Sequence, residues 1–454
     1  MVAKRTAVLG AGMLGLTVAY RLTRQGQSVT VIEREHQAGG LAAGFKVAAN
    51  PDGSPVYLDK FYHHLFRADH AVIDLIDELG LSERMVWPSP TSCILREGKI
   101  YRMDGALPLL VLKPLPFVDR IRLGAVIAYL KAEKVYQRFE RSTAQEWLTT
   151  WAGKNAYSVF AEPLLRQKFG QFSDQIAMSW FWSRVHLRST SLGYMLGGFQ
   201  ILYDSLVRAI EAGGGQVRLG SEVTAIEPRA DGSLTVTTRD EHGHGHGHGH
   251  GHGHGHGHGP EHYDRVVSTL PARVTIALTP SMPDDFRSMY GGGSALGAHC
   301  LILELDRQVT KHYWIAINDP GYPFLAVVEH TNYIPPEHYQ GKHLMYVGNY
   351  LPMDHPLYKK SGDQLFEEYL PYLRRISPDF QASWVTAVHS FAAPYAQPVV
   401  TTRFRESIAP HVTPIANLFM ANMFQIYPQD RGQNYSVAMA ERMVRLLDRI
   451  DTGS

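Results

Sequence analysis

The chain has 454 residues, of which 44% are hydrophobic and 19% charged, and this length predicts roughly two or three domains. Lys and Arg number 44 against 43 Asp and Glu, so no overall field draws in nucleic acid, and we expect no nucleic-acid partner. Two cysteines, Cys93 and Cys300, have no C-x-x-C spacing. This argues against a disulfide scaffold and favours a reducing, cytoplasmic compartment.

Apolar runs such as Gly124 to Leu130 fall far short of the roughly 20 residues that span a bilayer. The sequence therefore predicts no transmembrane segment and leaves peripheral membrane contact open. The N-terminal "MVAKRTAVLGAGMLGLTVAY" has the basic start and apolar run of a secretory signal, but no A-x-A-like cleavage site follows. Its glycine spacing favours a different interpretation.

That stretch predicts a βαβ unit. Thr6 to Leu9 form a short apolar strand, helical periodicity follows until Gly26, and "SVTVIE" forms a second strand that ends at Glu33. Between the first strand and the helix, "GAGMLG" is a G-x-G-x-x-G motif, in which glycines permit the tight turn, the approach of a pyrophosphate and close helix packing. Glu33 is placed to accept hydrogen bonds from an adenosine ribose. We therefore predict dinucleotide binding by Gly10, Gly12, Met13, Leu14, Gly15 and Glu33.

A second glycine-rich bend, "REHQAGGLAAGF", follows Glu33 and adds Arg34, Gly39, Gly40 and Leu41 to the candidate cofactor-binding residues. A nicotinamide domain does not need this bend, whereas a flavin runs on past the pyrophosphate to a deep site. Here the chain resembles the flavin-containing amine oxidase superfamily, in its protoporphyrinogen oxidase-like and phytoene desaturase-like branch, with UDP-galactopyranose mutase as a more distant relative. The resemblance implies non-covalent FAD, since no cysteine lies in the C-terminal flavin segment.

The resemblance covers most of the chain and implies an α/β fold. A Rossmann-like FAD-binding domain of the glutathione-reductase/amine-oxidase type is expected with a discontinuous α+β substrate domain. The FAD domain is expected at 1–68, 196–274 and 386–454, and the substrate domain at 69–195 and 275–385. "GGFQILYDSLVRAIEAGGGQVRLGSEVTAI" resembles the second FAD segment, with Val223 along the adenine. The family's C-terminal Gly-Asp is replaced by Ala421-Asn422, and the resemblance places near the flavin Asn422, Asp430, Arg431, Gly432, Asn434 and Tyr435.

Candidate substrate residues come from the segments between. In "YLDKFYHHLFRAD", His63 and His64 are candidates for proton handling, and because neighbours on an extended segment point in opposite directions, at most one should face the flavin. The other candidate catalytic residues are Lys168 and Tyr395. Arg166, Arg184 and Arg188 are candidates for holding an anionic group of a small-molecule substrate. Ordinary solvated charge and core packing are the alternatives for each.

"HGHGHGHGHGHGHGHGHG" (His242 to Gly259) falls between two predicted strands, where a hairpin tip tolerates insertion. Nine imidazoles are expected to bind divalent metal opportunistically, but no metal site of the enzyme is predicted there. The sequence as a whole predicts an FAD-dependent oxidoreductase that dehydrogenates a small organic substrate by hydride transfer to flavin N5. Two alternatives stay open, namely a non-redox mutase acting on a nucleotide sugar, and a metal-binding protein on a flavoprotein scaffold.

Overall fold

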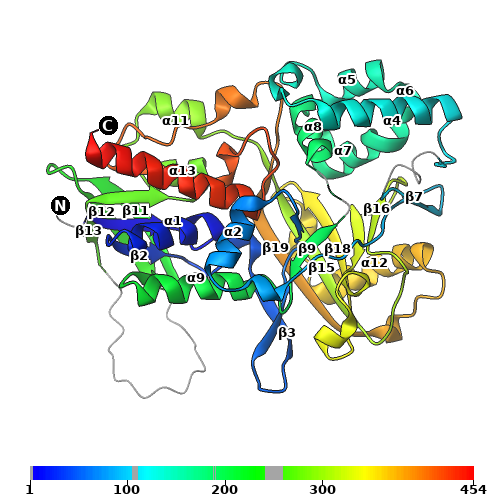
Figure 1. Ribbon diagram of the computed structural model, residues 1–454, viewed down its shortest axis with the longest axis horizontal. Coiled ribbons are helices and arrows are strands. Elements are labelled where there is room, and N and C mark those ends of the chain that lie inside the picture. The colour runs from blue at the N-terminus through cyan, green and yellow to red at the C-terminus, as the bar shows by residue number, and fades with distance from the viewer. Residues whose placement is uncertain (1–3, 105–110, 188, 190, 241–258, 454) are drawn as a thin grey trace.

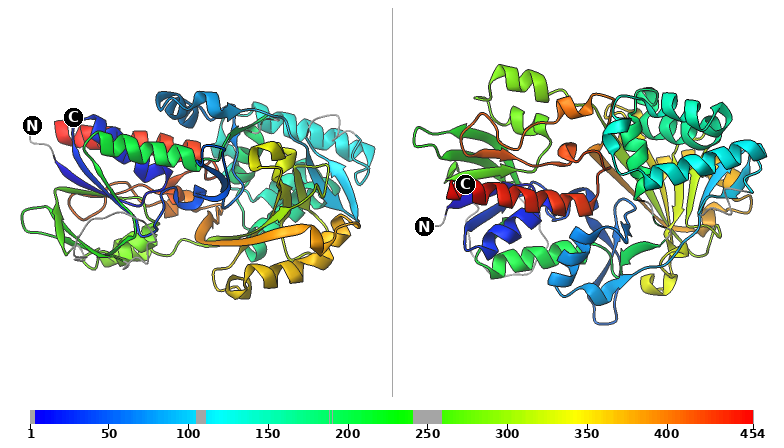
Figure 2. Two further views of the ribbon diagram at one scale, coloured as in Figure 1. Left: turned by 90° about the horizontal axis from the view of Figure 1, so that it is seen from below. Right: turned by 45° about the horizontal axis from the view of Figure 1, so that its top comes forward.

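The computed structural model describes residues 4–104, 111–187, 189, 191–240 and 259–453. Two regions lie side by side (Figure 1), one holding both chain ends and the other built on a large sheet. Figure 2 shows the same two regions from below and with the top of the molecule turned forward. In the described part of the chain, no helix is both long and apolar enough to cross a bilayer.

The first region is built on a five-stranded parallel sheet in the order β10-β2-β1-β14-β20. The strands are short and almost continuously apolar, as in Ala7–Leu9, which is typical of parallel strands covered on both faces. Ala7 lies between Thr30 and Val266 in register. The strands are β1 (Arg5–Leu9), β2 (Ser28–Ile32), β10 (Gln216–Arg218), β14 (Arg265–Ser268) and β20 (Leu418–Met420).

Different layers cover the two faces of this sheet. Val8 and Val31 pack among residues of the helices α1 (Met13–Arg24), α9 (Gln200–Ala212) and α13 (Gln433–Thr452). Ala7 and Leu9 point the other way, into a core shared with the antiparallel meander. The meander and the helices beside it are β11 (Ser221–Pro228), β12 (Leu234–Asp240), β13 (Glu261–Tyr263), α10 (Ala272–Ala277) and α11 (Asp284–Tyr290).

The second region is built on a seven-stranded sheet in the order β19-β15-β18-β17-β16-β7-β8, antiparallel except between β16 and β7. One face packs against α12 (Gly362–Ile376) through Leu365, Tyr369 and Leu373. The strands are β7 (Ser92–Arg96), β8 (Lys99–Arg102), β15 (Ala295–Leu305), β16 (Trp314–Ile317), β17 (Ala326–Glu329), β18 (His343–Leu351) and β19 (Val385–Pro398).

The opposite face of the seven-stranded sheet turns toward the first region. Cys300, Ile302 and Tyr346 join the same core as the helices beside the parallel sheet. A group of helices closes one end of the sheet and has a core of its own, which includes Trp180 and Trp182. These helices are α4 (Phe117–Ala132), α5 (Ala144–Trp151), α6 (Lys154–Ala156), α7 (Glu162–Phe169) and α8 (Met178–His186).

Smaller elements bridge the two regions. They are the hairpin β3 (Gly44–Ala49) and β4 (Pro55–Asp59), the helix α2 (His70–Glu78), and the three-stranded sheet of β5 (Leu65–Phe66), β6 (Met85–Val86) and β9 (Leu192–Met195). The 3-10 turn Gly40–Ala42 lies between β2 and β3.

The predicted fold class is confirmed, including the βαβ unit at 5–32 and the C-terminal helix. The strands that flank the His-Gly tract pair antiparallel, Val236 opposite Glu261, so the tract joins two strands of one hairpin. Residues 242–258 of the tract lie outside the described residues.

The domain boundaries stay predictions, and contacts place two boundary segments. Residues 386–398, expected in the FAD domain, lie in β19, which pairs along its length with β15 of the seven-stranded sheet. Helix α2, expected in the substrate domain, packs on α13 of the first region.

Candidate active site

The turn between β1 and α1 leaves open space for a ligand at one glycine only. Gly10 has φ +101°, and a Cβ on Gly15 would lie 2.0 Å from the Gly10 carbonyl oxygen, so the turn and helix press closely together. A Cβ on Gly12 would meet no atom within 4 Å. Gly12 caps α1 without a side-chain hydrogen bond, so the amides of Met13 and Leu14 open the helix at this space. A helix N-terminus of this kind fits a pyrophosphate.

Glu33 lies beside the same turn. Its Oε2 accepts a hydrogen bond from the Ala11 amide at 2.8 Å, and its Oε1 accepts one from the Glu35 amide at 3.0 Å. Each carboxylate oxygen has a second lone pair, so both remain able to accept a ribose hydroxyl. Arg34 is exposed and pairs with Glu35 at 3.1 Å, so it faces away from the turn.

The second glycine bend packs onto the first. The Gly39 amide donates to the Ala11 carbonyl at 2.8 Å, and a Cβ on Gly40 would lie 3.3 Å from the Gly12 Cα. Leu41 follows directly and lines a pocket at the interface of the two regions. The amide of Ser221, two residues before half-buried Val223, donates to the Glu33 carbonyl at 2.8 Å. Four segments of this region, around Gly12, Glu33, Gly39 and Ser221, are therefore joined by direct contacts.

The C-terminal segment supplies polar groups that lack a protein partner. Asn422 is buried beyond β20, and its Nδ2 has no hydrogen-bond partner among the described residues. The same holds for both amide atoms of Gln433, the first residue of α13, whose cap Gly432 makes no side-chain hydrogen bond. Buried polar atoms are costly unless paired. These orphaned groups and the open side of Gly12 show that the residues present fit a flavin dinucleotide.

Asn434 and Tyr435, which are also predicted to lie near the flavin, follow in the first turn of α13. The Oδ1 of Asn434 accepts from the Val72 amide at 3.2 Å, so this side chain docks α2 onto α13. Tyr435 is half-buried next to Gly432, and burial raises the pKa of its phenol.

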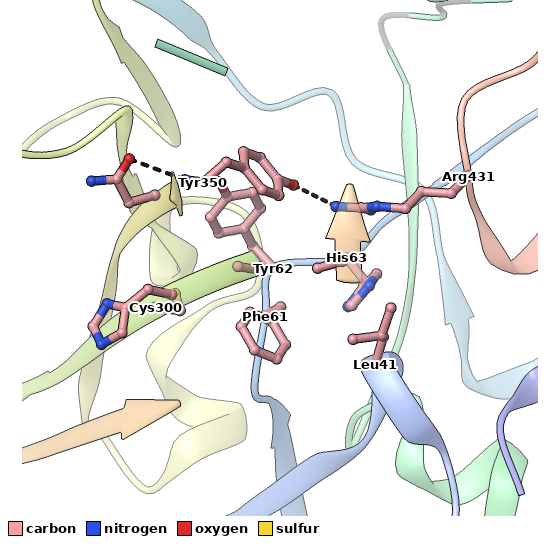
Figure 3. A pocket seen from close by; sticks show the side chains of 11 residues that line it. Leu41, Phe61, Tyr62, His63, Cys300, Tyr350 and Arg431 are labelled. Atoms are coloured by element: carbon pink, nitrogen blue, oxygen red, sulfur yellow. Dashed lines mark hydrogen bonds between the residues drawn. The ribbon is translucent and has the colours of Figure 1, made fainter. Parts of the chain in front are cut away.

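Figure 3 shows the pocket at the interface, where His63 and Arg431 approach from one side and Tyr62 and Tyr350 from the other. Residues from six separate stretches line it, namely Leu41, Phe61, Tyr62, His63, Ala298, His299, Cys300, Asn349, Tyr350, Ala396 and Arg431. Burial, with a smaller contribution from Arg431, lowers the pKa of His63 to about 4. His64 does not line the pocket and lies edge-on to Phe66.

A cluster of charges lies directly behind Arg431. Asp430 accepts from Arg184 Nη1 at 2.8 Å and from the Trp180 indole at 3.2 Å, and it lies 3.5 Å from the buried Lys168 Nζ. Burial alone would raise the pKa of Asp430, but the three cations Lys168, Arg184 and Arg431 hold it well below its usual range.

Arg431 Nη2 donates to the phenol of Tyr350 at 2.6 Å. Burial alone would raise the pKa of Tyr350, but the charges of Arg431 and Lys168 lower it overall. Lys168 packs over the same ring at 5.0 Å without lining the pocket, so it acts on the site through Tyr350 and Asp430.

Two predicted residues are not brought into this site. The Arg166 side chain is 71% exposed and pairs with Glu162 one turn earlier on α7. Tyr395 packs on Arg273 at 5.2 Å, and its neighbour Ala396 lines the pocket instead. Arg188 lies outside the described residues.

Sequence reasoning missed several lining residues, chiefly Tyr62, His299, Cys300, Asn349 and Tyr350. The last four lie on β15 and β18, two apolar strands paired in register (His299 opposite Asn349). Polar residues within apolar strands are a weak signal, and only the pairing of the strands brings these four together.

A sequence model of the family described as "Flavin containing amine oxidoreductase" matches residues 14–428. Mitochondrial protoporphyrinogen oxidase of Nicotiana tabacum is 36% identical over 109 residues, which cover 24% of this chain and 19% of that enzyme. The 15-cis-phytoene desaturase of Solanum lycopersicum is 26% identical over 252 residues, covering 50% of this chain and 42% of that enzyme. The chain thus matches less than half the length of either relative.

Solved structures match nearly the whole chain. A protein of Exiguobacterium sp. 255-15, provisionally described as a protoporphyrinogen oxidase, superposes with a TM-score of 0.74 at 18% identity, covering 98% of this chain and 99% of that one. Reduced UDP-galactopyranose mutase superposes with a TM-score of 0.71 at 15% identity, covering 100% of this chain and 96% of that one. Putrescine oxidase bound to putrescine superposes with a TM-score of 0.67 at 14% identity, covering 98% of this chain and 99% of that one. These likenesses show the fold.

Proposed function

Because the chain belongs to the flavin containing amine oxidoreductase family, we propose that it dehydrogenates a small organic substrate in the pocket between its two regions. The protein is an FAD-dependent oxidoreductase. When bound, FAD would supply a two-electron acceptor, and its N5 atom would take the hydride from a C–H bond of the substrate. One observation carries the proposal: Leu41 of the second glycine bend and Arg431, two residues before α13, both line the pocket that the seven-stranded sheet closes.

The residues divide the work along the cofactor path. The glycine turn leaves its helix amides to the pyrophosphate, and Glu33 accepts from the ribose. The N-terminus of α13, without a side-chain cap, favours negative charge next to it. Phe61, Tyr62 and Leu41 restrict water at the substrate end. His63 is uncharged at neutral pH, since its pKa is lowered to about 4, so it offers an N–H and a lone pair to the substrate.

The first experiment measures cofactor and electron flow in the purified protein. We expect a yellow protein whose FAD is released by acid or heat, and whose flavin band bleaches anaerobically with the substrate and returns on addition of oxygen or another acceptor. Flavin that stays with the denatured chain would contradict non-covalent binding. A protein without flavin would refute the proposal as a whole.

The mutase alternative is tested in the same preparation. A nucleotide sugar that isomerises only after chemical reduction of the flavin, with no net consumption of acceptor, would support it and contradict dehydrogenation. The deletion of the His-Gly tract described below tests the metal-binding alternative. Among the described residues, no group of three or more His, Cys, Asp or Glu side chains is arranged to hold a metal ion.

A further inference from the structure

The lining of the pocket has an uneven charge. Among the lining residues that the structure describes, Arg431 is the only Arg or Lys, and Asp and Glu do not occur. Burial lowers the pKa of both lining histidines, His63 and His299, to about 4, so both are neutral. The remaining polar groups are the phenols of Tyr62 and Tyr350, the amide of Asn349 and the thiol of Cys300.

The groups behind the pocket add to this positive charge. Lys168, Arg184 and Arg431 all act on one carboxylate, Asp430. Asp430 accepts directly from Arg184 and is 3.5 Å from Lys168, and neither of these partners lines the pocket. Charges removed from water need a partner of opposite sign. This set has three cations to one carboxylate, and Lys168 and Asp430 are both almost fully buried.

Arg431 itself has hydrogen-bonding capacity to spare. Its Nη2 donates to Tyr350, and its Nε is buried without a hydrogen-bond partner in the described part of the chain. The guanidinium is planar and presents its donors as a rigid fork, which matches a carboxylate or phosphate. Tyr350 fixes one arm of this fork, so the group is held in position before a ligand arrives.

We propose that Arg431 binds an anionic group of the substrate, a carboxylate or a phosphate, and that Tyr350 and Lys168 are positioning residues for this contact. The proposal rests on the proposed function and names its substrate class. It also excludes a protonated amine, because an ammonium would be taken from water into a lining that offers it a guanidinium and no carboxylate. In this respect the site differs in kind from one built for a polyamine, although the fold is shared.

The test titrates the FAD-containing protein with small aromatic probes of equal shape and different charge, and follows the visible flavin spectrum. The probes are benzoate, benzamide and benzylamine, with inorganic phosphate as a separate arm. We expect benzoate to bind at least about tenfold more tightly than benzamide, and benzylamine to bind more weakly than either. Equal affinity for benzoate and benzamide without binding of phosphate, or a preference for benzylamine, would overturn the proposal without any variant.

Two arginine variants then locate the contact. Arg431→Gln is expected to lose the preference for benzoate over benzamide, whereas Arg166→Gln, which removes an exposed arginine from the helix that carries Lys168, should keep it. Because the comparison is a ratio of two affinities, it stands even where Arg431→Gln lowers FAD occupancy. Arg431→Lys covers the case in which the glutamine variant does not fold, and it should retain a reduced preference. An unchanged ratio in Arg431→Gln would refute the assignment.

The probes distinguish a phosphate-bearing substrate from a carboxylate-bearing one, and they distinguish failure of the anion site from failure of the proposed function. Tight binding of phosphate with weak binding of benzoate identifies a phosphate-bearing substrate, and the reverse identifies a carboxylate. A flavin-containing protein that shows no anion preference leaves the dehydrogenase proposal standing and refutes this inference. A protein that holds no flavin refutes the proposed function instead.

Discussion

Two alanine substitutions in the same glycine turn should fail in opposite ways. Gly12 and Gly15 both belong to the G-x-G-x-x-G motif, but their surroundings differ. A Cβ on Gly15 would lie 2.0 Å from the carbonyl oxygen of Gly10, whereas a Cβ on Gly12 would meet nothing within 4 Å. Gly15→Ala should therefore disturb the packing of the helix on the strand. Gly12→Ala should only fill the space into which we place the pyrophosphate.

The structure sets the expected magnitudes. The Gly15 Cβ overlaps a backbone carbonyl that has no rotamer to change, so we expect the cost of overpacking, about 1–3 kcal/mol of apoprotein stability. Gly12 has φ −74° and ψ 175°, which alanine adopts without strain, so the apoprotein of Gly12→Ala should be within about 0.5 kcal/mol of the parent. Its methyl group would keep the pyrophosphate from one or two amide hydrogen bonds. At about 1.5–3 kcal/mol each, the loss of one or two of them weakens FAD binding by about 10- to 10,000-fold.

The assay separates stability from affinity. Apoprotein of the parent and both variants is unfolded in urea, and FAD is then titrated back while the quenching of flavin fluorescence is followed. Gly12→Ala should unfold with the parent and bind FAD poorly, and Gly15→Ala should unfold earlier. Parent-like FAD affinity in Gly12→Ala would place the pyrophosphate elsewhere. An apoprotein of Gly15→Ala as stable as the parent would show that the helix can shift, and would refute the packing argument.

Three further outcomes are expected. Glu33→Arg should weaken FAD retention strongly, because it removes the carboxylate beside the Ala11 amide. The matched control is Arg34→Gln, which changes an exposed side chain. Equal FAD content in both variants would mean that other groups hold the ribose. Deleting His242 to Gly259, so that Glu241 joins Pro260, should leave FAD content and the rate of flavin reduction within about twofold of the parent. The same deletion should abolish retention on a nickel resin. Loss of flavin reduction with FAD still bound would show that the tract reaches the active site. Because burial lowers the folded-state pKa of His63 from 6.5 to about 4, its contribution to stability is complete above pH 6.5 and is lost as the pH falls toward 4. The free energy of unfolding should therefore fall less over this window in His63→Gln, and parallel curves for parent and variant would contradict the burial of a neutral imidazole.

The sequence predicted those elements that depend on interactions between residues close together in the chain. The strand at 5–9, the helix at 13–24 and the strand at 28–32 follow from an apolar run, a 3.6-residue period and a glycine stop at Gly26. Dinucleotide binding could be predicted because the glycine turn and the acidic residue after the second strand lie within about 30 residues. The second glycine bend and the family resemblance then named FAD. The position of the His-Gly tract in a hairpin followed from the strands on either side of it.

The substrate end of the site could not be predicted in the same way. Arg166 and Lys168 are two residues apart on one helix, yet one lies in solvent and the other is buried against Asp430. Only the packing of α7 and α8 against the loop before α13 decides between them. Tyr395 and Ala396 differ likewise, because β19 turns one toward Arg273 and the other into the pocket.

The sequence by itself therefore determined the fold class through short-range patterns of glycine, charge and hydrophobic period, and its resemblance to a flavoprotein family named the cofactor. The tertiary structure alone decided which side chains share the pocket. His63, Cys300, Tyr350 and Arg431 are separated by long stretches of chain and meet only where the seven-stranded sheet, the segment after β4 and the loop before α13 converge. The charge of that pocket is a sum over groups that the packing brings within a few ångströms of each other, and no pattern along the chain records that sum.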